Sequence, residues 1–414
     1  MAVLYSATLF VSAFLLFAIQ PMAGKALLPW LGGAPDVWNA CMFFFQGVLL
    51  LGYLYAHALS RFASRRAQPF LHLAVLATAT TVVLLVRPHA PDDAAQISTR
   101  PVFWILKSLA AWVGIPYFTL AATSPLLQKW FSSSRHRRAA DPYFLYSASN
   151  WGSLAALLSY PLAVEPWLGL SSQRNVWAAG YVVLAFLLAA IAVSLARSRE
   201  RFEARPRAAR PARPARIAAW IGLAFLPSSL LLGATTYLST DIAPIPLLWV
   251  VPLAIYLLTF IYAIEVSPRL LGKLRHACAL LALMIVLTIL KPSAYPVWLV
   301  VALHLALLGT AALLCHATLM RRRPHVGDLT LFYLCISIGG VLGGLFNSVL
   351  APRLFTSLAE YPIAILLVCA MRSAVPERGE KKPRWKPDLG FAALVGALGV
   401  GLGYATALVP GLPT

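Results

Sequence analysis

Long apolar runs separated by short loops constrain this sequence more than any other feature. Most of them are long enough to cross the hydrocarbon core of a bilayer as an α-helix. Because 60% of the 414 residues are hydrophobic and only 12% are charged, a soluble core cannot use so much apolar sequence. We therefore expect an all-α integral membrane protein of about 13 transmembrane helices, and we exclude a cytosolic enzyme. The predicted helices cover residues 4–20, 37–60, 69–86, 101–128, 142–164, 175–196, 217–238, 243–264, 276–290, 296–320, 328–350, 356–371 and 389–410.

Basic residues are distributed unevenly between alternate loops. With the N-terminus placed in the cytoplasm, the inner loops hold 27 of the 34 Lys and Arg residues and the outer loops hold six, while Lys107 lies inside the fourth run. Since cytoplasmic loops carry the excess of positive charge, this predicts a multi-pass protein of the bacterial inner (cytoplasmic) membrane with its C-terminus in the periplasm. The net charge of +20 then reflects membrane orientation, and we expect no nucleic-acid partner.

The fifth and eleventh apolar runs match each other without a gap. At a constant offset of 187, Asp141 corresponds to Asp328 and Tyr146 to Tyr333. Two runs that are six helices apart have the same orientation, so they indicate a parallel repeat like that of the two halves of major facilitator proteins. We predict a major-facilitator-like 6+6 helix parallel repeat plus one additional C-terminal helix. The predicted domains are an N-terminal six-helix bundle (1–197), a basic cytoplasmic linker (198–216), a C-terminal six-helix bundle (217–373), and a cytoplasmic loop with the extra transmembrane helix (374–414).

Four polar residues of the second run form what we call the polar strip. At about 100° per residue, Asn39, Gln46, Tyr53 and His57 fall within one narrow arc of a helix. Polar groups facing lipid are costly, so this face is expected to meet a watery cavity or the polar groups of another helix. We favour a cavity lining, because Gln and His are bulkier than helix packing requires.

The fifth and eleventh runs also carry polar faces. Tyr146 and Asn150 share one face of the fifth run, and Tyr333, Ser337 and Asn347 lie on the matching face of the eleventh. In a transporter these residues would line the interface between the two halves. Ordinary packing by small and hydroxylated residues is the alternative, above all in the glycine-rich eleventh run.

Few ionisable residues occur at membrane depth. No carboxylate lies at mid-membrane, which disfavours a carboxylate proton relay and a site for a polycation. Lys25 or Lys107 would favour an anionic or zwitterionic solute, although Lys25 could instead extend to the membrane surface. His304 and His316 are candidates for proton coupling, with a purely structural hydrogen bond as the alternative. Asp141 begins a helix and is expected to cap it.

Signatures of enzymes and cofactor-binding proteins are missing from the sequence. It contains no dinucleotide-binding, Walker, zinc-protease or serine-hydrolase motif. The five cysteines lie in apolar runs without CxxC spacing, so they indicate neither a zinc site nor a disulfide framework. We expect no catalytic residue, no metal and no cofactor.

Three long strings carry a family resemblance. They begin FAIQPMAGKALLPWLGG (residues 17–57), SPLLQKWFSSSRHRR (124–166) and CHATLMRRRPHVGDL (315–355), and together they resemble the membrane region of bacterial fused major-facilitator and spermidine-synthase-like proteins. The resemblance implies the membrane fold and a link to a polyamine-like or related metabolite. That family adds a soluble aminopropyltransferase-like domain, and because the sequence ends at Thr414 we expect that domain to be missing here. In addition, Thr318 stands where the family is expected to have an acidic residue, so polyamine synthesis is not implied.

Three functions remain open from the sequence. The leading hypothesis is a transporter that moves a small organic solute by alternating access, with the lipid bilayer and the solute as its partners and with Asn39, Gln46 and Tyr53 binding the solute. The alternative is a non-transporting membrane anchor or subunit for a separately encoded partner, either an aminopropyltransferase-like enzyme or another complex. A weaker third hypothesis is a membrane enzyme that uses His316 or His57 on a lipid-borne substrate.

Overall fold

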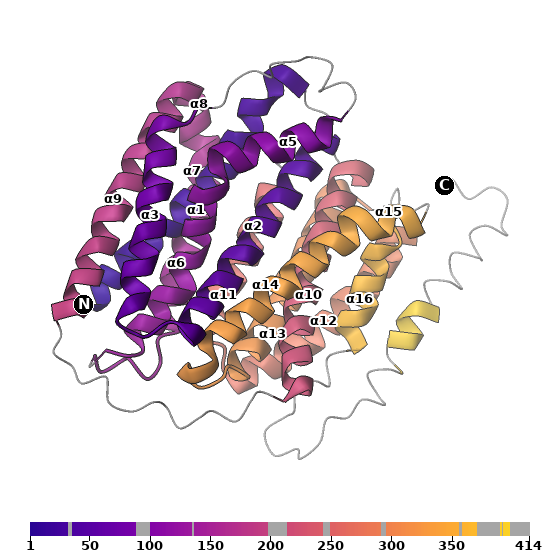
Figure 1. The fold of residues 1–414 in the computed structure, drawn as a ribbon. Coiled ribbons are helices and arrows are strands. Elements are labelled where there is room, and N and C mark those ends of the chain that lie inside the picture. The colour runs from indigo at the N-terminus through magenta and orange to yellow at the C-terminus, as the bar shows by residue number, and fades with distance from the viewer. Residues whose placement is uncertain are drawn as a thin grey trace. The chain divides into compact units, whose positions relative to one another are not determined.

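Every element that the structure describes is helical (Figure 1). The predicted linker and the thirteenth predicted helix lie mostly outside the described residues, although residues 392–397 are helical. The structure, a computed structural model, describes residues 1–31, 35–87, 100–134, 136–197, 213–242, 249–290, 295–355, 358–370, 390 and 392–397.

Twelve of the predicted helices are present in the described part of the chain. Eight of them are long and apolar enough to cross a membrane: Ala2–Leu31, Ala40–Phe62, Ala67–Leu85, Pro101–Phe131, Leu170–Arg197, Pro214–Thr240, Val297–Arg321 and Val326–Leu354. The other four predicted ranges contain α7 (Phe144–Ser159), α11 (Val250–Tyr262), α12 (Pro268–Leu290) and α16 (Glu360–Ala370). The protein is therefore a multi-pass membrane protein.

Contacts along the chain divide it into two compact units. Unit 1 contains Met1–Ala218 and Arg323–Val341, and unit 2 contains Ala219–Arg322 and Leu342–Thr414. The sequence places residues 323–341 in the C-terminal bundle (217–373), whereas their contacts place them in unit 1. The division into six plus six helices stays a prediction.

Unit 1 is built around its first helix. Helix α1 contacts α6, α7 and α9, and an added Cβ at Gly152 of α7 would lie 2.2 Å from the Phe10 carbonyl oxygen of α1. Only glycine permits so close an approach of two backbones. The Trp177 indole of α9 donates a hydrogen bond to the Leu15 carbonyl oxygen at 2.9 Å. The helical segments of this unit are α1 (Ala2–Leu31), α2 (Pro35–Phe62), α3 (Ala67–Leu85), α5 (Pro101–Leu109), the π-helical η1 (Ala110–Gly114), α6 (Ile115–Phe131), α7, the π-helical η2 (Tyr160–Val164), α8 (Glu165–Trp167) and α9 (Leu170–Arg197).

Unit 2 packs around α13. This helix contacts α11 and α12, and its end is fixed where the Arg321 guanidinium donates to the Val266 carbonyl oxygen at 2.9 Å. At Gly233 of α10, an added Cβ would lie 3.0 to 3.2 Å from atoms of Tyr361 on α16. The further segments named here are α10 (Pro214–Tyr237), the π-helical η3 (Leu238–Ile242), α13 (Val297–Arg321), the 3₁₀ helix η5 (Val326–Asp328), α14 (Leu329–Leu345), the π-helical η6 (Phe346–Leu350) and α15 (Ala351–Leu354).

The duplication seen in the sequence extends to the backbone. Helix α7 continues through η2 into α8 and ends at Leu168, where the backbone becomes extended. Helix α14 continues through η6 into α15 and ends in the same way at Phe355. The two ends are 187 residues apart, which is the offset that aligns the two sequences.

Candidate functional site

Helix α2 packs tightly against α6 along one face. Phe45 and Ala56 are buried on this face, and an added Cβ at Gly52 would lie 2.7 Å from the Ala121 Cβ and 2.9 Å from the Phe118 carbonyl oxygen. The glycine thus lets the two helices approach closely. Gln46 and Tyr53 each follow a residue of this face, so they point about 100° away from it.

Gln46 and Tyr53 form the open part of the polar strip. Both side chains are half-buried, and neither has a hydrogen bond to any residue that the structure describes. In a membrane-crossing helix, polar side chains that no described residue satisfies are available to water or a solute. Asn39 belongs to the same strip, but its side chain lies outside the described part of the structure.

The other end of the polar strip is closed by the start of α14. The His57 Nδ1 lies 3.0 Å from the Thr330 Oγ1, and the Ser60 Oγ lies 3.0 Å from the same atom. His57 therefore has a partner among the described residues, whereas Gln46 and Tyr53 have none there.

Contacts from α6 hold the segment that precedes α14. The Lys129 Nζ donates to the carbonyl oxygens of Val326 and Gly327, at 2.7 and 3.1 Å. The ammonium group has three donors and each carbonyl oxygen has two lone pairs, so Lys129 can bind both oxygens at once.

Residues near the start of α7 hold the same segment from another side. The Tyr143 hydroxyl donates to the Pro324 carbonyl oxygen at 3.0 Å, and the Arg323 guanidinium lies over the Tyr143 ring and pairs with Asp141 at 2.6 Å. Burial raises the pKa of the Tyr143 phenol above its ordinary value, and Arg323 opposes that shift. The expected helix cap at Asp141 is wrong, because α7 begins later, after Tyr143, and has no side-chain cap. Asp141 forms an ion pair instead.

Two tyrosine–glutamine pairs lie near the open part of the strip. The Gln20 Nε2 of α1 donates to the Tyr117 hydroxyl at 3.3 Å, and the Tyr333 hydroxyl of α14 donates to the Gln128 Oε1 of α6 at 2.5 Å. The Tyr53 phenol lies within electrostatic range of both the Tyr117 and the Tyr333 phenols.

Sequence reasoning found only part of this cluster. It predicted Tyr53 and Tyr333 and missed Gln20, Tyr117 and Gln128. The two glutamines are single polar residues in long apolar runs, which is a signal the sequence does carry. Tyr117 has no such signal, because a tyrosine in an apolar run is commonly a packing residue.

On the predicted polar face of α7, the Asn150 side chain hydrogen-bonds within its own helix. The Asn150 Nδ2 donates to the Tyr146 carbonyl oxygen, four residues earlier, at 2.9 Å. Tyr146 itself packs against Tyr333 with ring centroids 5.3 Å apart. On α14 the Ser337 hydroxyl is buried and has no partner among the described residues. The structure therefore brings Tyr146 to the cluster and gives Asn150 a packing environment.

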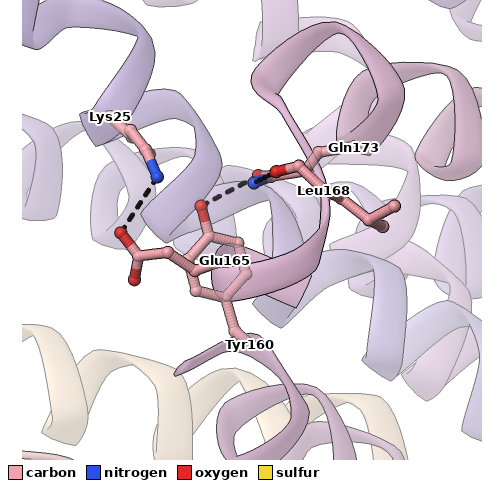
Figure 2. Close-up of polar contacts among 5 residues, drawn as sticks. All are labelled: Lys25, Tyr160, Glu165, Leu168 and Gln173. Atoms are coloured by element: carbon pink, nitrogen blue, oxygen red, sulfur yellow. Dashed lines mark hydrogen bonds and ion pairs between the residues drawn. The ribbon is translucent and has the colours of Figure 1, made fainter. Parts of the chain in front are cut away.

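The two predicted lysines have different environments. Lys25 pairs with Glu165 at 3.0 Å, with 37% and 41% of the two side chains exposed. Figure 2 shows this pair beside a hydrogen bond from the Tyr160 hydroxyl to the Gln173 Oε1. Lys107 on α5 is exposed. Since Lys25 already has a carboxylate partner, the cation expected to attract an anionic solute is neutralised.

The predicted histidines of unit 2 are fully buried. The His304 Nδ1 lies 2.6 Å from the Tyr361 hydroxyl and its Nε2 lies 3.4 Å from the Thr288 Oγ1. The His316 Nδ1 lies 2.9 Å from the Thr259 Oγ1, while its Nε2 has no partner among the described residues. A lipid-borne substrate has no path to a side chain with no exposed surface, so the geometry does not favour an enzyme that uses His316.

Asn347, the last predicted site residue, also lies in unit 2. Its Nδ2 donates to the Ser229 Oγ of α10 at 2.8 Å and to the Gly343 carbonyl oxygen at 2.9 Å. It therefore joins η6 to α10, and its amide donors are used by the protein. Within the described residues, no group of three or more His, Cys, Asp or Glu side chains is placed to hold a metal ion.

Comparison with known proteins identifies the fold. No protein-family profile and no curated protein matches the chain. The inward-open xylose transporter XylE from E. coli is similar to it, with a TM-score of 0.56 and 13% identity over 95% of this chain and 98% of that chain. So is XylE, an MFS proton:xylose symporter, bound to 6-bromo-6-deoxy-D-glucose, with a TM-score of 0.55 and 15% identity over 95% of this chain and 98% of that one.

A peptide transporter gives a third match. An auto-inhibited POT family peptide transporter has a TM-score of 0.52 and 13% identity over 100% of this chain and 98% of its own. At such identities a structural likeness reveals the fold and leaves the substrate open. This protein has the all-α, multi-pass membrane fold of the major facilitator transporters.

Proposed function

We propose that this protein transports a small organic solute across a membrane by alternating access. One observation carries the proposal: Gln46 and Tyr53 lie in a membrane-crossing helix, are half-buried, and have no partner among the described residues. Two unpartnered polar groups within a bilayer cost several kcal/mol unless water or a ligand satisfies them. The transporter fold makes an aqueous solute path the natural explanation.

The decisive variant is Gln46→Leu, tested in proteoliposomes. Uptake of radiolabelled D-xylose, a dipeptide and spermidine covers the solutes named for the structural neighbours and the polyamine that the sequence resemblance implies. We expect uptake to fall at least tenfold, because the amide is the ligand's partner. Thermal stability should change little, because the described structure gives the amide no partner to lose.

A tyrosine on the other side of the same helix provides the control. The Tyr55 hydroxyl is buried without a partner among the described residues, and its ring packs on Phe118. Tyr55→Phe should keep uptake and stability. If Gln46→Leu lowers stability while uptake per folded molecule is preserved, the transport site is misplaced, and a non-transporting subunit of a separately encoded partner becomes the better proposal.

We further propose that the chain lies in the bacterial inner membrane with its N-terminus in the cytoplasm. The excess of basic residues in alternate loops supports this orientation. A reporter inserted near Arg207 should be active only in the cytoplasm, and one fused after Thr414 only in the periplasm. Two reporters on the same side would overturn the thirteen-helix topology.

A further inference from the structure

The chemistry of the open polar strip restricts what it can bind. The Gln46 amide offers two donors and an acceptor, and the Tyr53 hydroxyl offers one donor and also accepts. Neither group is used by a described residue. A matching ligand must therefore accept and donate at neighbouring atoms, which hydroxyl groups do.

The two tyrosine–glutamine pairs near Tyr53 are polar without being charged. Gln20 and Tyr117 bind each other, as do Gln128 and Tyr333, and the Tyr53 phenol lies within electrostatic range of both tyrosines. The Gln128 side chain is fully buried and Tyr117 nearly so. These pairs hold fixed dipoles beside the open groups and provide no countercharge.

The ionic groups of α1 and α6 already have partners. Lys25 is paired with Glu165, and Lys129 donates to the carbonyl oxygens of Val326 and Gly327. Moving a carboxylate or an ammonium group from water to a site without an opposite charge costs several kcal/mol. Gln46 and Tyr53 therefore receive no free countercharge from α1 or α6, and this disfavours an ionic solute relative to a neutral one.

Aromatic rings pack against the tyrosines of both pairs. Phe45 and Tyr117 lie with ring centroids 4.8 Å apart, and Tyr146 and Tyr333 lie 5.3 Å apart. Rings provide flat apolar surface next to hydrogen-bonding groups. That combination suits a compact molecule with carbon–hydrogen faces and hydroxyl edges.

We propose that the solute is an uncharged polyhydroxylated molecule, held by the Gln46 amide and the Tyr53 hydroxyl. This proposal rests on the proposed transport function and specifies its substrate class. It replaces the anionic or zwitterionic solute that the two lysines suggested in the sequence.

Binding to the purified full chain tests the substrate class separately from transport. The probes are D-xylose and myo-inositol as neutral polyols, glycyl-glycine as a zwitterion, succinate as an anion and spermidine as a polycation, each followed by calorimetry in detergent. We expect a polyol to bind and the three charged probes not to bind. Gln46→Leu and Tyr53→Phe should each weaken polyol binding at least fivefold, while Tyr55→Phe, with its hydroxyl on the other side of α2, should leave it unchanged.

The outcomes separate the two proposals. Binding of a charged probe that is sensitive to Gln46→Leu, or binding of neither polyol, overturns the substrate class. Polyol binding that Gln46→Leu and Tyr53→Phe leave intact overturns the site. If a polyol binds as expected but the same polyol is not taken up into proteoliposomes, the substrate class stands and the transport function fails.

Discussion

The two copies of the duplicated helix have the same backbone plan and different surroundings. Each copy contains a π-helical segment, η2 or η6, and each ends in extended backbone, at Leu168 and at Phe355. A π-helical segment interrupts the regular hydrogen bonding of an α-helix and is rare. The two segments lie one residue away from the offset of 187, so the duplication preserved the π-helical interruption while the side chains around it changed.

The difference between the copies lies in what each one touches. At Gly152 the first copy is in backbone contact with α1, whereas at Gly340 of the second copy, the position equivalent to Ser153, an added Cβ would have no atom within 4 Å. The first copy leads into Glu165, the partner of Lys25. The offset of 187 places Pro352 at the equivalent position of the second copy, so the ion pair has no counterpart there. A repeat in sequence therefore predicts the path of the backbone better than its contacts.

The largest loss of stability is expected from a substitution at the contact between α1 and α7. In Gly152→Ala the new Cβ would lie 2.2 Å from the Phe10 carbonyl oxygen, so α1 and α7 must separate. Overpacking of this kind costs about 1–3 kcal/mol and sometimes more, and we expect the upper end of that range. Gly340→Ala, at an open glycine of the second copy one residue past the equivalent of Gly152, should not destabilise the protein. Unfolding by denaturing detergent measures both variants, and equal losses would contradict the close approach of α1 and α7 at Gly152.

The second-largest loss of stability is expected from breaking the hydrogen bond that joins α14 to α6. Tyr333→Phe removes the donor to the Gln128 Oε1 and leaves that oxygen unpaired in a side chain with no exposed surface. An unsatisfied buried acceptor costs about 1–3 kcal/mol, so the melting temperature should fall. Tyr55→Phe removes a hydroxyl that has no described partner and should be neutral. If the two variants have the same melting temperature, the hydrogen bond of Tyr333 does not stabilise unit 1.

Sequence predicted the fold and the polar strip because both depend on local patterns. Apolar runs give the twelve described helices, and a spacing of seven residues puts Gln46 and Tyr53 on one face. The hydrogen-bond and ion-pair partners of these side chains, however, lie far from them in the sequence. Nothing in the sequence indicates that Thr330 meets His57 or that Glu165 meets Lys25, because both pairs are made by helices brought together only in the folded chain.

A moderate loss of stability is expected when the asparagine of the second copy, Asn347, is replaced. The Asn347 amide donates to Ser229 on another helix, whereas the Asn150 amide donates within its own helix. Hydrogen bonds between membrane helices average about 0.6 kcal/mol, so Asn347→Ala should cost about that much and Asn150→Ala less. Detergent unfolding of both variants ranks them, and a larger loss in Asn150→Ala would reverse the assignment of Asn150 to packing within its helix.

The smallest effect is expected from the ion pair that only the first copy has. Lys25 and Glu165 are 37% and 41% exposed, and water screens such a pair, so its coupling should be about 0.2–1 kcal/mol. A double-mutant cycle of Lys25→Met, Glu165→Gln and the double variant isolates this coupling from the effect of each change alone. The coupling should shrink further between 0.1 and 1 M salt, because mobile ions reach exposed charges. A coupling above about 2 kcal/mol that is insensitive to salt would show that the bilayer shields the pair, and Lys25 would then be a structural element of the first copy.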